Sequence, residues 1–578
     1  MSVAPGLRPT HAPHNSATET TIRSFVIAGR ATARSSEPWA VYAVAVSVVV
    51  AVPLVVVIAS LFAPYTDAWR HLAATVLPRY IENSVWLMLG VGAGVTVIGV
   101  TTAWLVTMTS FPGVRRFEWA LILPLAMPAY VIGYTYTGLG DFAGPVQSSL
   151  RAWFGWGAHD YWFPEVRSLP GAIVMLILVF YPYVYLLARV AFIDQSVCAI
   201  EVSRTLGRTP WQSFLHVSLP LARPAIMSGV ALALMETLGD FGTVQYFGVD
   251  TFTTGIYRTW LGMGEPGTAA QLAAMLLLMI FALVLLERWS RGGRRYHHMS
   301  AYYRSLPRYK LHGAKAAGAW LACALPVAFG FVVPALALAS WTIGNAATSF
   351  DAAYVQLIVN TLTLAAVGSV LTVVIAASLA FAARLGTGAA TRAAVRVATL
   401  GYAVPGTVLA VGIMLPFIAI DTQLDTLMRS AFGISTGLLL SGTLAAVVYG
   451  YVVRFLAVAL TPIESALARV TPSIAGAARV LGASPAEAVR RVHAPLVAGG
   501  VFTAAILVLV EVIKELPATL IMRPFNFDTL AIRTYQLASD ERLSEVALPA
   551  LTIVLVGIVP VILLSRALAR SRPGHGET

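Results

Sequence analysis

Long apolar stretches separated by short polar turns recur along the whole chain. A helix that crosses a bilayer needs about 20 mostly apolar residues, because lipid offers no hydrogen-bond partner to the backbone. By that length the sequence predicts twelve spanning helices, some of them interrupted by Gly or Pro. Their centres lie near residues 52, 96, 128, 181, 235, 279, 329, 371, 408, 446, 510 and 556. We therefore expect an all-α integral membrane protein with about twelve spanning helices.

The composition fits a chain that is solvated mainly by lipid. Of its 578 residues, 58% are hydrophobic and 11% are charged, and the mean hydropathy is +0.76, whereas soluble domains contain about a quarter charged residues.

Residues 1–39 lack the short apolar core of a cleavable signal peptide, so the first span is expected to remain as an anchor. Cys198 and Cys323 are expected at the cytoplasmic face and within the seventh span, and they support neither a disulfide framework nor a thiolate metal site.

The placement of charge indicates how the chain lies in the membrane. The net charge of +12 could suggest a nucleic-acid partner, but Lys and Arg gather in the N-terminal arm, after the sixth span and in the shorter even-numbered turns. Odd-numbered turns hold more balanced charge, for example Asp141, Arg151 and Asp160. Because positive residues concentrate on the cytoplasmic side of membrane proteins, both termini are expected in the cytoplasm, with no nucleic-acid partner.

The two halves of the chain repeat one another. Asn83 and Pro128 recur 277 residues later as Asn360 and Pro405. Further on the offset is 275, and the matched pairs are Gly207 with Gly482, Pro220 with Pro495, Glu236 with Glu511, Asp240 with Glu515, and Arg258 with Arg533. A constant offset that changes once by two residues indicates a duplicated unit. Because each half holds six spans, both are expected to have the same orientation in the membrane.

The repeat also predicts the domain organisation. We expect a cytoplasmic N-terminal arm (1–39), a first half (40–288) with a cytoplasmic loop at 201–220, a basic cytoplasmic linker (289–314), a second half (315–570) with a matching loop at 476–495, and a C-terminal tail (571–578).

The two matching loops carry the strongest local pattern. They read EVSRTLGRTPWQSFLHVSLP and GAARVLGASPAEAVRRVHAP, with a Gly six residues after the first position and a Pro at the end. This pattern predicts a short helix, a turn at Gly207 or Gly482, a second helix, and a new span that begins at Pro220 or Pro495. Such a loop forms a compact, rigid knob on the cytoplasmic side. Two amphipathic loops that merely cap the helix bundle are the alternative.

These loops resemble the EAA motif of ABC importer permeases, which reads Glu-Ala-Ala, Gly, and then Ile-x-Leu-Pro at this spacing. The first copy keeps Glu201 but continues with Val202 and Ser203, and the second has Gly476 in place of the Glu. The resemblance implies a fold like that of type I ABC importer permeases, in which each loop docks on a partner ATPase. The residues implied for this coupling are Glu201, Gly207, Pro220, Gly476, Ala477, Ala478, Gly482 and Pro495.

ATP hydrolysis is expected on another polypeptide. The chain lacks a G-x-x-x-x-G-K-[ST] loop that could bind ATP phosphates. We therefore expect that this chain is not an enzyme, that it binds no cofactor, and that ATP and Mg are used by the partner. With both loops in one chain, a single copy would supply both docking sites.

Ionisable residues also lie within two predicted spans. Glu236 and Asp240, and likewise Glu511 and Glu515, are four residues apart and are expected to share a helix face. Charges inside spans are costly and face a cavity or a partner, so four carboxylates could present oxygen ligands to a hard cation such as ferric iron. Alternatively, they lie near the membrane edge, or pair with each other and with Lys514 to lock the halves. No residue set of the His/Cys kind assigns a metal site.

The segments METLGDFGTVQYFGVDTFTTGIYRTW and KELPATLIMRPFNFDTLAIRTY resemble the fused ferric-iron ABC importer permeases. The resemblance covers nearly all of residues 40–570. It implies ferric-iron import through the bacterial inner membrane, a periplasmic ferric-binding protein, and a cytoplasmic ABC ATPase dimer.

Other readings of the same pattern stay open. Related permeases for thiamine, polyamines or phosphonates share much of it, and an ion-coupled carrier could use the four carboxylates as a relay. For the binding protein, the outer turns at 141–170 and 523–545 are the expected docking surface.

Overall fold

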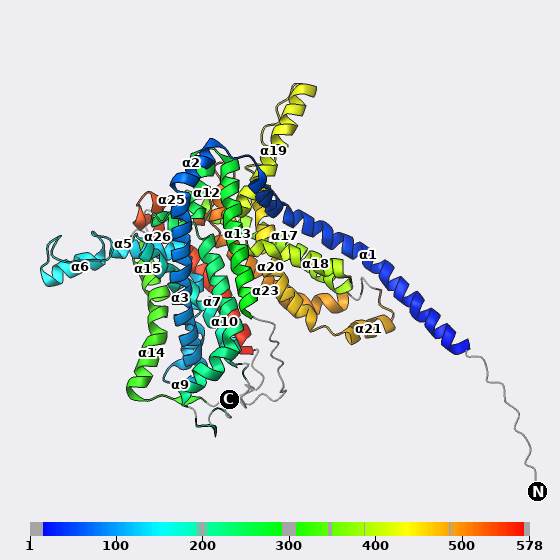
Figure 1. The fold of residues 1–578 in the computed structure, drawn as a ribbon, viewed down its shortest axis with the longest axis horizontal. Helices are drawn as coiled ribbons and strands as arrows, with labels where there is room; N and C mark the ends of the chain where they lie inside the picture. The colour runs from blue at the N-terminus through cyan, green and yellow to red at the C-terminus, as the bar shows by residue number, and fades with distance from the viewer. Residues whose placement is uncertain are drawn as a thin grey trace, which may run out of the picture.

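The protein is an almost entirely helical bundle (Figure 1). The computed structural model describes residues 16–193, 195, 203, 205–207, 209–291, 308–344, 350–386, 388–484, 487 and 489–570. Within these ranges, 11 helices are long and apolar enough to cross a membrane. A further pair, Val114–Ala126 and Ala129–Phe154, is bent by 90° and makes up to 12 spans if it is counted as one. The prediction of about twelve spanning helices is thereby confirmed.

The helices of the two halves follow one another in a matching order. The first half contains α1 (Ser16–Ala59), α2 (Asp67–Thr75), α3 (Leu77–Met108), α4 (Val114–Ala120), α5 (Ala129–Gly140), α6 (Pro145–Phe154), α7 (Leu169–Ile193), α9 (Pro210–Ser213), α10 (Leu219–Gly239), α11 (Gly242–Tyr246), α12 (Phe252–Tyr257) and α13 (Pro266–Arg291). The second half contains α14 (Gly313–Val327), α15 (Val333–Gly344), α17 (Ala352–Leu385), α18 (Ala389–Ala398), α19 (Gly406–Phe432), α20 (Leu444–Ala468), α21 (Pro472–Val480), α23 (Ala494–Lys514), α24 (Pro517–Met522), α25 (Leu530–Ser539) and α26 (Leu543–Arg570).

Short segments of tighter or wider helix join these elements. The 3-10 segments are η1 (Ser60–Phe62), η2 (Leu123–Ala126) and η6 (Thr399–Ala403), and the π-helical ones are η3 (Phe214–Ser218), η4 (Arg258–Gly262), η5 (Ala328–Val332) and η7 (Val489–His493).

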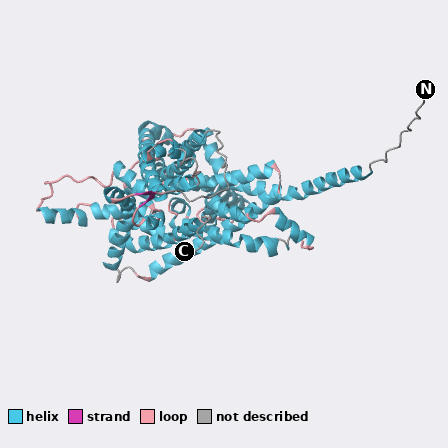
Figure 2. Ribbon diagram, turned by 90° about the horizontal axis from the view of Figure 1, so that it is seen from below, coloured by secondary structure: helices cyan, strands magenta, loops and turns pink. Residues whose placement is uncertain are grey.

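One small sheet departs from the all-α expectation. β1 (Thr109–Ser110) pairs in parallel with β2 (Tyr309–Lys310), and Figure 2 shows this strand pair among the helices. The Arg308 guanidinium lies 3.3 Å from the Glu118 carboxylate next to this pair. The end of the basic linker is therefore fastened to the turn that follows α3.

Each half receives its first spanning helix from the other. α1 packs against α17, α18 and α19 of the second half, whereas α14 packs on α3 and α4 of the first. Glycines allow the close approach: a Cβ at Gly412 would collide with the carbonyl oxygen of Pro53, and one at Gly330 with that of Leu178. Small residues at such crossings are typical of helices that associate within lipid. The halves are thus interlocked, an arrangement that the sequence did not predict.

The duplicated unit recurs in the side-chain contacts. The Asn83 side-chain amide donates a hydrogen bond to the carbonyl oxygen of Asp250 (2.8 Å), and that of Asn360 donates to the carbonyl oxygen of Asp528 (3.1 Å). Pro128 and Pro405 each precede the helix that follows a 3-10 segment, α5 and α19 respectively. These matched contacts confirm the internal repeat.

Two helices break at matched positions, and this corrects one expectation. α10 ends at Gly239 and α23 at Lys514, so Asp240 and Glu515 lie just past a helix end, with ψ of 134° and 119°, rather than on its face. Asp240 accepts hydrogen bonds from the backbone N–H of Val244 (3.0 Å) and from the Thr243 hydroxyl (2.9 Å). Glu515 accepts one from a backbone N–H of α24 at 3.1 Å. Each carboxylate thus caps the short helix that follows the break.

Interlocking through Gly412 can be tested by adding one methyl group. Because the Cβ of Gly412→Ala would overlap a backbone carbonyl of α1, we expect destabilisation of about 1–3 kcal/mol. Thermal unfolding of the detergent-solubilised protein would measure this loss. Gly318→Ala is the matched control, because a Cβ at Gly318 meets no atom within 4 Å. Equal unfolding temperatures for the two variants would show that the close crossing does not hold the halves together.

The capping role of Asp240 predicts a difference between two substitutions. Asp240→Ala removes the acceptor for α11 and should lower the free energy of unfolding by about 1 kcal/mol, whereas Asp240→Asn retains a capping side chain and should lower it by less. The same thermal measurement distinguishes them. If both variants lose the same stability, the charge of Asp240 matters rather than its capping bonds.

Candidate functional site

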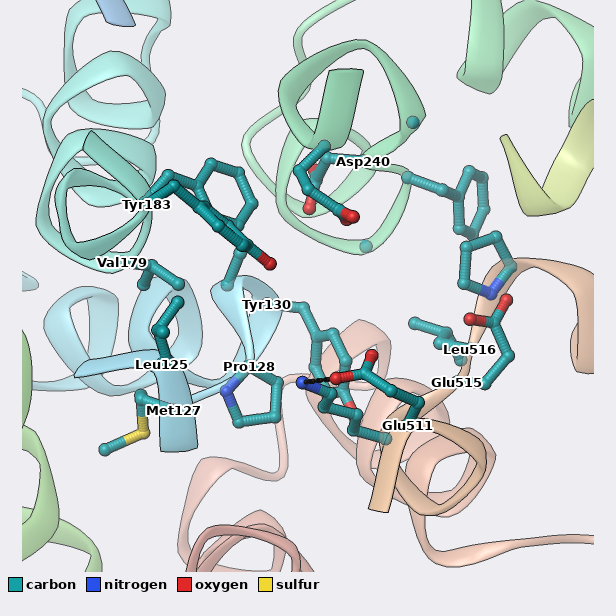
Figure 3. A pocket seen from close by; sticks show the side chains of 18 of the residues that line it. Leu125, Met127, Pro128, Tyr130, Val179, Tyr183, Asp240, Glu511, Glu515 and Leu516 are labelled. Carbon is teal, nitrogen blue, oxygen red and sulfur yellow. Dashed lines mark ion pairs between the residues drawn. The ribbon is translucent and has the colours of Figure 1, made fainter. Parts of the chain in front are cut away.

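A cavity of about 110 Å³ lies between the two halves (Figure 3). It is bounded by η2 and α5, the middle of α7, the broken ends of α10 and α23, and the middle of α20. Six charged side chains line it: Glu236, Asp240, Arg454, Glu511, Lys514 and Glu515. All four carboxylates that the sequence singled out therefore reach one cavity.

The carboxylates of the second half have cationic partners. The Lys514 ammonium lies 2.7 Å from Glu511, and the Arg454 guanidinium lies 3.5 Å from Glu515. The sequence offered Lys514 as a partner that would lock the two halves. Its ion pair with Glu511, however, joins two residues of the same helix, α23. Both of these ion pairs lie within the second half.

The carboxylates of the first half differ. Within the part of the chain that the structure describes, no Lys, Arg or His nitrogen lies within 4 Å of Glu236 or Asp240. Asp240 is held by its capping bonds, whereas Glu236 and Tyr183 line the same cavity. In Figure 3, Tyr183 and Asp240 extend into the cavity from one side, opposite Glu511 and Glu515. The cavity is thus electrostatically asymmetric.

The carboxylates do not form a ready-made metal site. Among the described residues, no three His, Cys, Asp or Glu side chains are close enough to hold a metal ion together. Three of the four carboxylates instead have their oxygens engaged by protein groups: two are in ion pairs and one caps a helix.

Several residues of the cavity were missed by sequence reasoning. Arg454 is a charge in the middle of the apolar stretch of α20, so the rule that flagged the carboxylates could have found it. Tyr130 and Tyr183 lie in aromatic-rich apolar segments, and nothing local distinguishes them from core tyrosines.

An aromatic cluster lies beside the cavity. Phe241 lines the cavity and is almost fully buried. Its ring centroid lies 4.7 Å from that of Tyr257 in α12 and 5.6 Å from that of Tyr535 in α25. Because α12 belongs to the first half and α25 to the second, the cluster joins the two halves.

The two matching loops adopt the predicted turns. Gly207 has a φ of +77° and Gly482 a φ of +83°, the left-handed region that favours glycine. Pro220 lies in the first turn of α10 and Pro495 in the first turn of α23. Glu201, the acidic residue of the first copy, lies outside the described residues.

An exposed leucine precedes each of these glycines. Leu206 is 74% exposed and Leu481 is 86% exposed, and they are related by the offset of 275. In the second loop, α21 carries Gly476 and Ala477 at its surface, while Ala478 is buried. Both loops therefore present an apolar side chain at a rigid turn, as the repetition of Leu-Gly in the sequence could have indicated.

Two outer turns of different halves meet. Arg167 forms an ion pair with Glu541 at 3.0 Å, and its guanidinium lies 4.9 Å from the ring centroid of Tyr246. Residues 141–170 and 523–545, which the sequence had suggested as one docking surface, are thereby joined across the halves.

Comparison with known proteins shows similarity to membrane permeases. Residues 96–294 match the family described as binding-protein-dependent transport system inner membrane component. The chain is 27% identical over 504 residues to the Fe(3+)-transport system permease protein FbpB 2 of Haemophilus influenzae, covering 85% of this chain and 90% of that protein. The molybdenum permease ModB of Escherichia coli is 27% identical over 33% of the chain and 83% of its own length. The sulfate permease CysT of E. coli is 28% identical over 34% of the chain and 72% of its own length.

The share of the chain that each relative covers follows the division of the chain into two halves. ModB and CysT each match about one third of this chain, whereas FbpB 2 extends over both halves. Together with the helical bundle and the paired loops, the comparisons confirm the resemblance that the motifs indicated. The chain is therefore similar to the inner-membrane permeases of binding-protein-dependent ABC importers, with two matching halves in one polypeptide.

Proposed function

We propose that this permease carries ferric iron into the cell, driven by a partner ATPase. The observation that supports the cargo best is the excess of carboxylates over cations in the cavity between the halves. Other relatives are named for molybdenum and sulfate transport, and an anion such as sulfate would be repelled by a cavity whose four carboxylates outnumber its two cations. The relative that extends over both halves is named for Fe(3+) transport. Charge and similarity therefore favour the same cargo.

The paired loops are the proposed contacts with a cytoplasmic ABC ATPase dimer. Each offers an exposed leucine on a turn whose glycine fixes its direction, and a rigid element of this kind can transmit a displacement to the helix that follows it. Because Pro220 and Pro495 begin α10 and α23, a push on a loop would reach the cavity through one continuous helix. In this proposal the loops and both termini lie in the cytoplasm, and ATP and Mg are used by the partner ATPase.

The periplasmic binding protein is proposed to dock at the opposite end. The turns at 141–170 and 523–545 form one surface there through the pair Arg167–Glu541. A docked protein that separated these turns would act on both halves at once. Below this surface, the cluster of Phe241, Tyr257 and Tyr535 would have to part before an ion could enter the cavity.

An ion-coupled carrier fits the cavity less well. Such a relay needs carboxylates that can exchange protons or sodium ions, but Glu511 and Glu515 are held in ion pairs. Polyamine is a cationic alternative for the cargo, and thiamine and phosphonate remain alternatives from the sequence pattern. Competition by each compound distinguishes them from iron.

Uptake of radioactive ferric iron is the direct test of the cargo. Cells that lack this gene should lose uptake at low iron concentration, and the intact gene should restore it. Uptake should persist when the ion gradient is collapsed, provided that ATP is maintained, and should stop when ATP is depleted. Unlabelled polyamine, thiamine, phosphonate, molybdate and sulfate should not compete. Unchanged iron uptake in the deletion would exclude iron as the main cargo.

The loop turns can be tested separately from the cargo. A side chain at positive φ costs about 1–2 kcal/mol, so Gly482→Ala should distort the second loop and reduce ATP hydrolysis coupled to the loaded binding protein by about tenfold. The measurement uses proteoliposomes that contain the permease with its ATPase.

Gly499→Ala is the matched control for this experiment. Gly499 lies in α23, the helix that follows the second loop, its φ is not positive, and an added Cβ meets no atom within 4 Å. Coupled hydrolysis that is equally high in both variants would contradict the coupling role of the turn at Gly482.

A further inference from the structure

Equivalent segments of the two halves leave the helix bundle in different directions. By the offset of 277, Gly144 corresponds to Asp421. The second half continues through this point as one helix, α19, whereas the first half is divided into α5 and α6. The segment Ala129–Phe154, which comprises α5 and α6, is bent by 90° from Val114–Ala126. In Figure 1, α6 extends sideways from the bundle, across the direction of α3 and α14, whereas α19 continues beyond the end of the bundle.

The division between α5 and α6 requires a residue without a side chain at position 144. A Cβ added to Gly144 would lie 2.6 Å from the carbonyl oxygen of Gly138. At the equivalent position, Asp421 accepts hydrogen bonds from the backbone N–H of Leu440 (3.0 Å) and of Ser441 (2.8 Å). The chain that returns from α19 is therefore fastened to that helix by a carboxylate that the first half lacks at this point.

The polar side chains of α6 bond to the segment that returns from it. The Arg151 guanidinium donates hydrogen bonds to the Tyr161 hydroxyl (2.9 Å) and to the carbonyl oxygen of Phe142 (2.8 Å). The Tyr161 hydroxyl in turn donates to the side-chain oxygen of Gln147 (2.7 Å). The guanidinium carbon also lies 4.2 Å from the centroid of the Phe142 ring. Residues 142–162, here called the aromatic arm, thus form one folded unit whose polar groups satisfy one another.

An apolar stripe lies on another face of α6. Val146, Leu150 and Trp153 follow the spacing i, i+4, i+7, which places them on one side of a helix. Leu150 is half-buried, Val146 is exposed, and Trp153 is 80% exposed. Trp162, in the returning segment, is 85% exposed. Tryptophan is enriched where membrane proteins meet the headgroup layer of the bilayer, because its ring is amphipathic.

Contacts with a spanning helix show at which level of the membrane the arm begins. A Cβ added to Gly138, near the end of α5, would lie 2.8 Å from the ring of Trp341. Trp341 lies near the end of the candidate span Gly313–Gly344, whose 32 residues are long enough, at about 1.5 Å per residue, to reach the headgroups on both sides. α7 begins just after the arm, at Leu169, and ends at Ile193, just before the first of the paired loops. The arm therefore begins at headgroup level, on the side opposite the paired loops.

We propose that the aromatic arm lies in the interfacial layer of the bilayer, with Val146, Leu150 and Trp153 directed toward the lipid tails. A helix that lies in the membrane plane, with an apolar face toward the tails, binds lipid through that face. The hydrogen bonds of Arg151 and Gln147 to the returning segment keep the polar face of α6 supplied with partners. The occupant of the stripe is therefore lipid, and Arg167, which lies beyond the arm, stays at the surface proposed for the binding protein. This inference holds for any cargo.

An anchored arm would fix one wall of the cavity relative to the membrane. Tyr130, which lines the cavity, lies in the first turn of α5, and the arm follows the last turn of the same helix. The equivalent helix of the second half, α19, begins at Gly406 and continues past the bundle without such an arm. In a rocking movement of the halves, α5 would therefore remain close to the membrane plane while α19 is free to tilt.

A spin label at position 153 measures whether lipid covers the stripe. The full-length permease carries Trp153→Cys in a background of Cys198→Ser and Cys323→Ala, and it is placed in nanodiscs of phosphatidylethanolamine and phosphatidylglycerol. Collisions with oxygen, which concentrates in lipid, and with a water-soluble nickel chelate give the depth of the label. We expect a depth of about 5–10 Å below the boundary between headgroups and tails. The label should be shallower than one at Val97→Cys, exposed in the middle of α3, and deeper than one at Phe432→Cys, the last residue of α19.

Ala152→Cys is the matched control on the same helix. Ala152 is also exposed, but one residue rotates the helix by about 100°, so its label should point away from the stripe and lie closer to water. Every variant is first shown to be as heat-stable as the wild type, and Val146→Cys replaces Trp153→Cys if the latter fails. Equal depths at positions 152 and 153, or a depth at 153 equal to that at Phe432 or Val97, would overturn the proposal. A label at 153 that neither reagent reaches would also overturn it, because protein would then cover the stripe.

Discussion

Peptide groups in the hydrocarbon of a bilayer have no water to bind, so a spanning helix can break only where other groups satisfy the freed backbone. α10 and α23 break at equivalent points, and the carboxylates of Asp240 and Glu515 accept hydrogen bonds from the helices that follow. The broken ends of α10 and α23 line the cavity between the halves. The carboxylates that accept hydrogen bonds from the backbone at these breaks therefore also face the space through which a cargo is proposed to pass.

Duplication built a symmetric scaffold whose halves have since acquired different electrostatics. The hydrogen bonds of Asn83 and Asn360 are the same in both halves, and the loop glycines share the same left-handed turn. In contrast, Arg454 and Lys514 have no counterpart in the first half. Symmetry is kept where the chain contacts itself or its proposed ATPase, and it is lost where the cargo would pass. A permease built from two identical chains would have the same charges in both halves.

Much of this architecture could be predicted from the sequence, because lipid imposes long apolar stretches and because duplicated motifs reveal the repeat. The turns at Gly207 and Gly482 followed from local chemistry. Other features could not be predicted. The interlocking of α1 with α19 depends on contacts between segments far apart in the chain, and the position of Asp240 depends on a helix end that the spacing of four residues did not reveal.

The exchange of first helices has a consequence for biosynthesis. A ribosome that has completed α13 has released every spanning helix of the first half, yet the surface that receives α14 is still exposed to lipid and α1 has not met α17 or α19. The first half is therefore an unfinished intermediate until the second emerges, and α1 must wait in the membrane for partners made more than 300 residues later. Insertion in this protein precedes packing by a long interval, which makes it a natural client for membrane chaperones during synthesis.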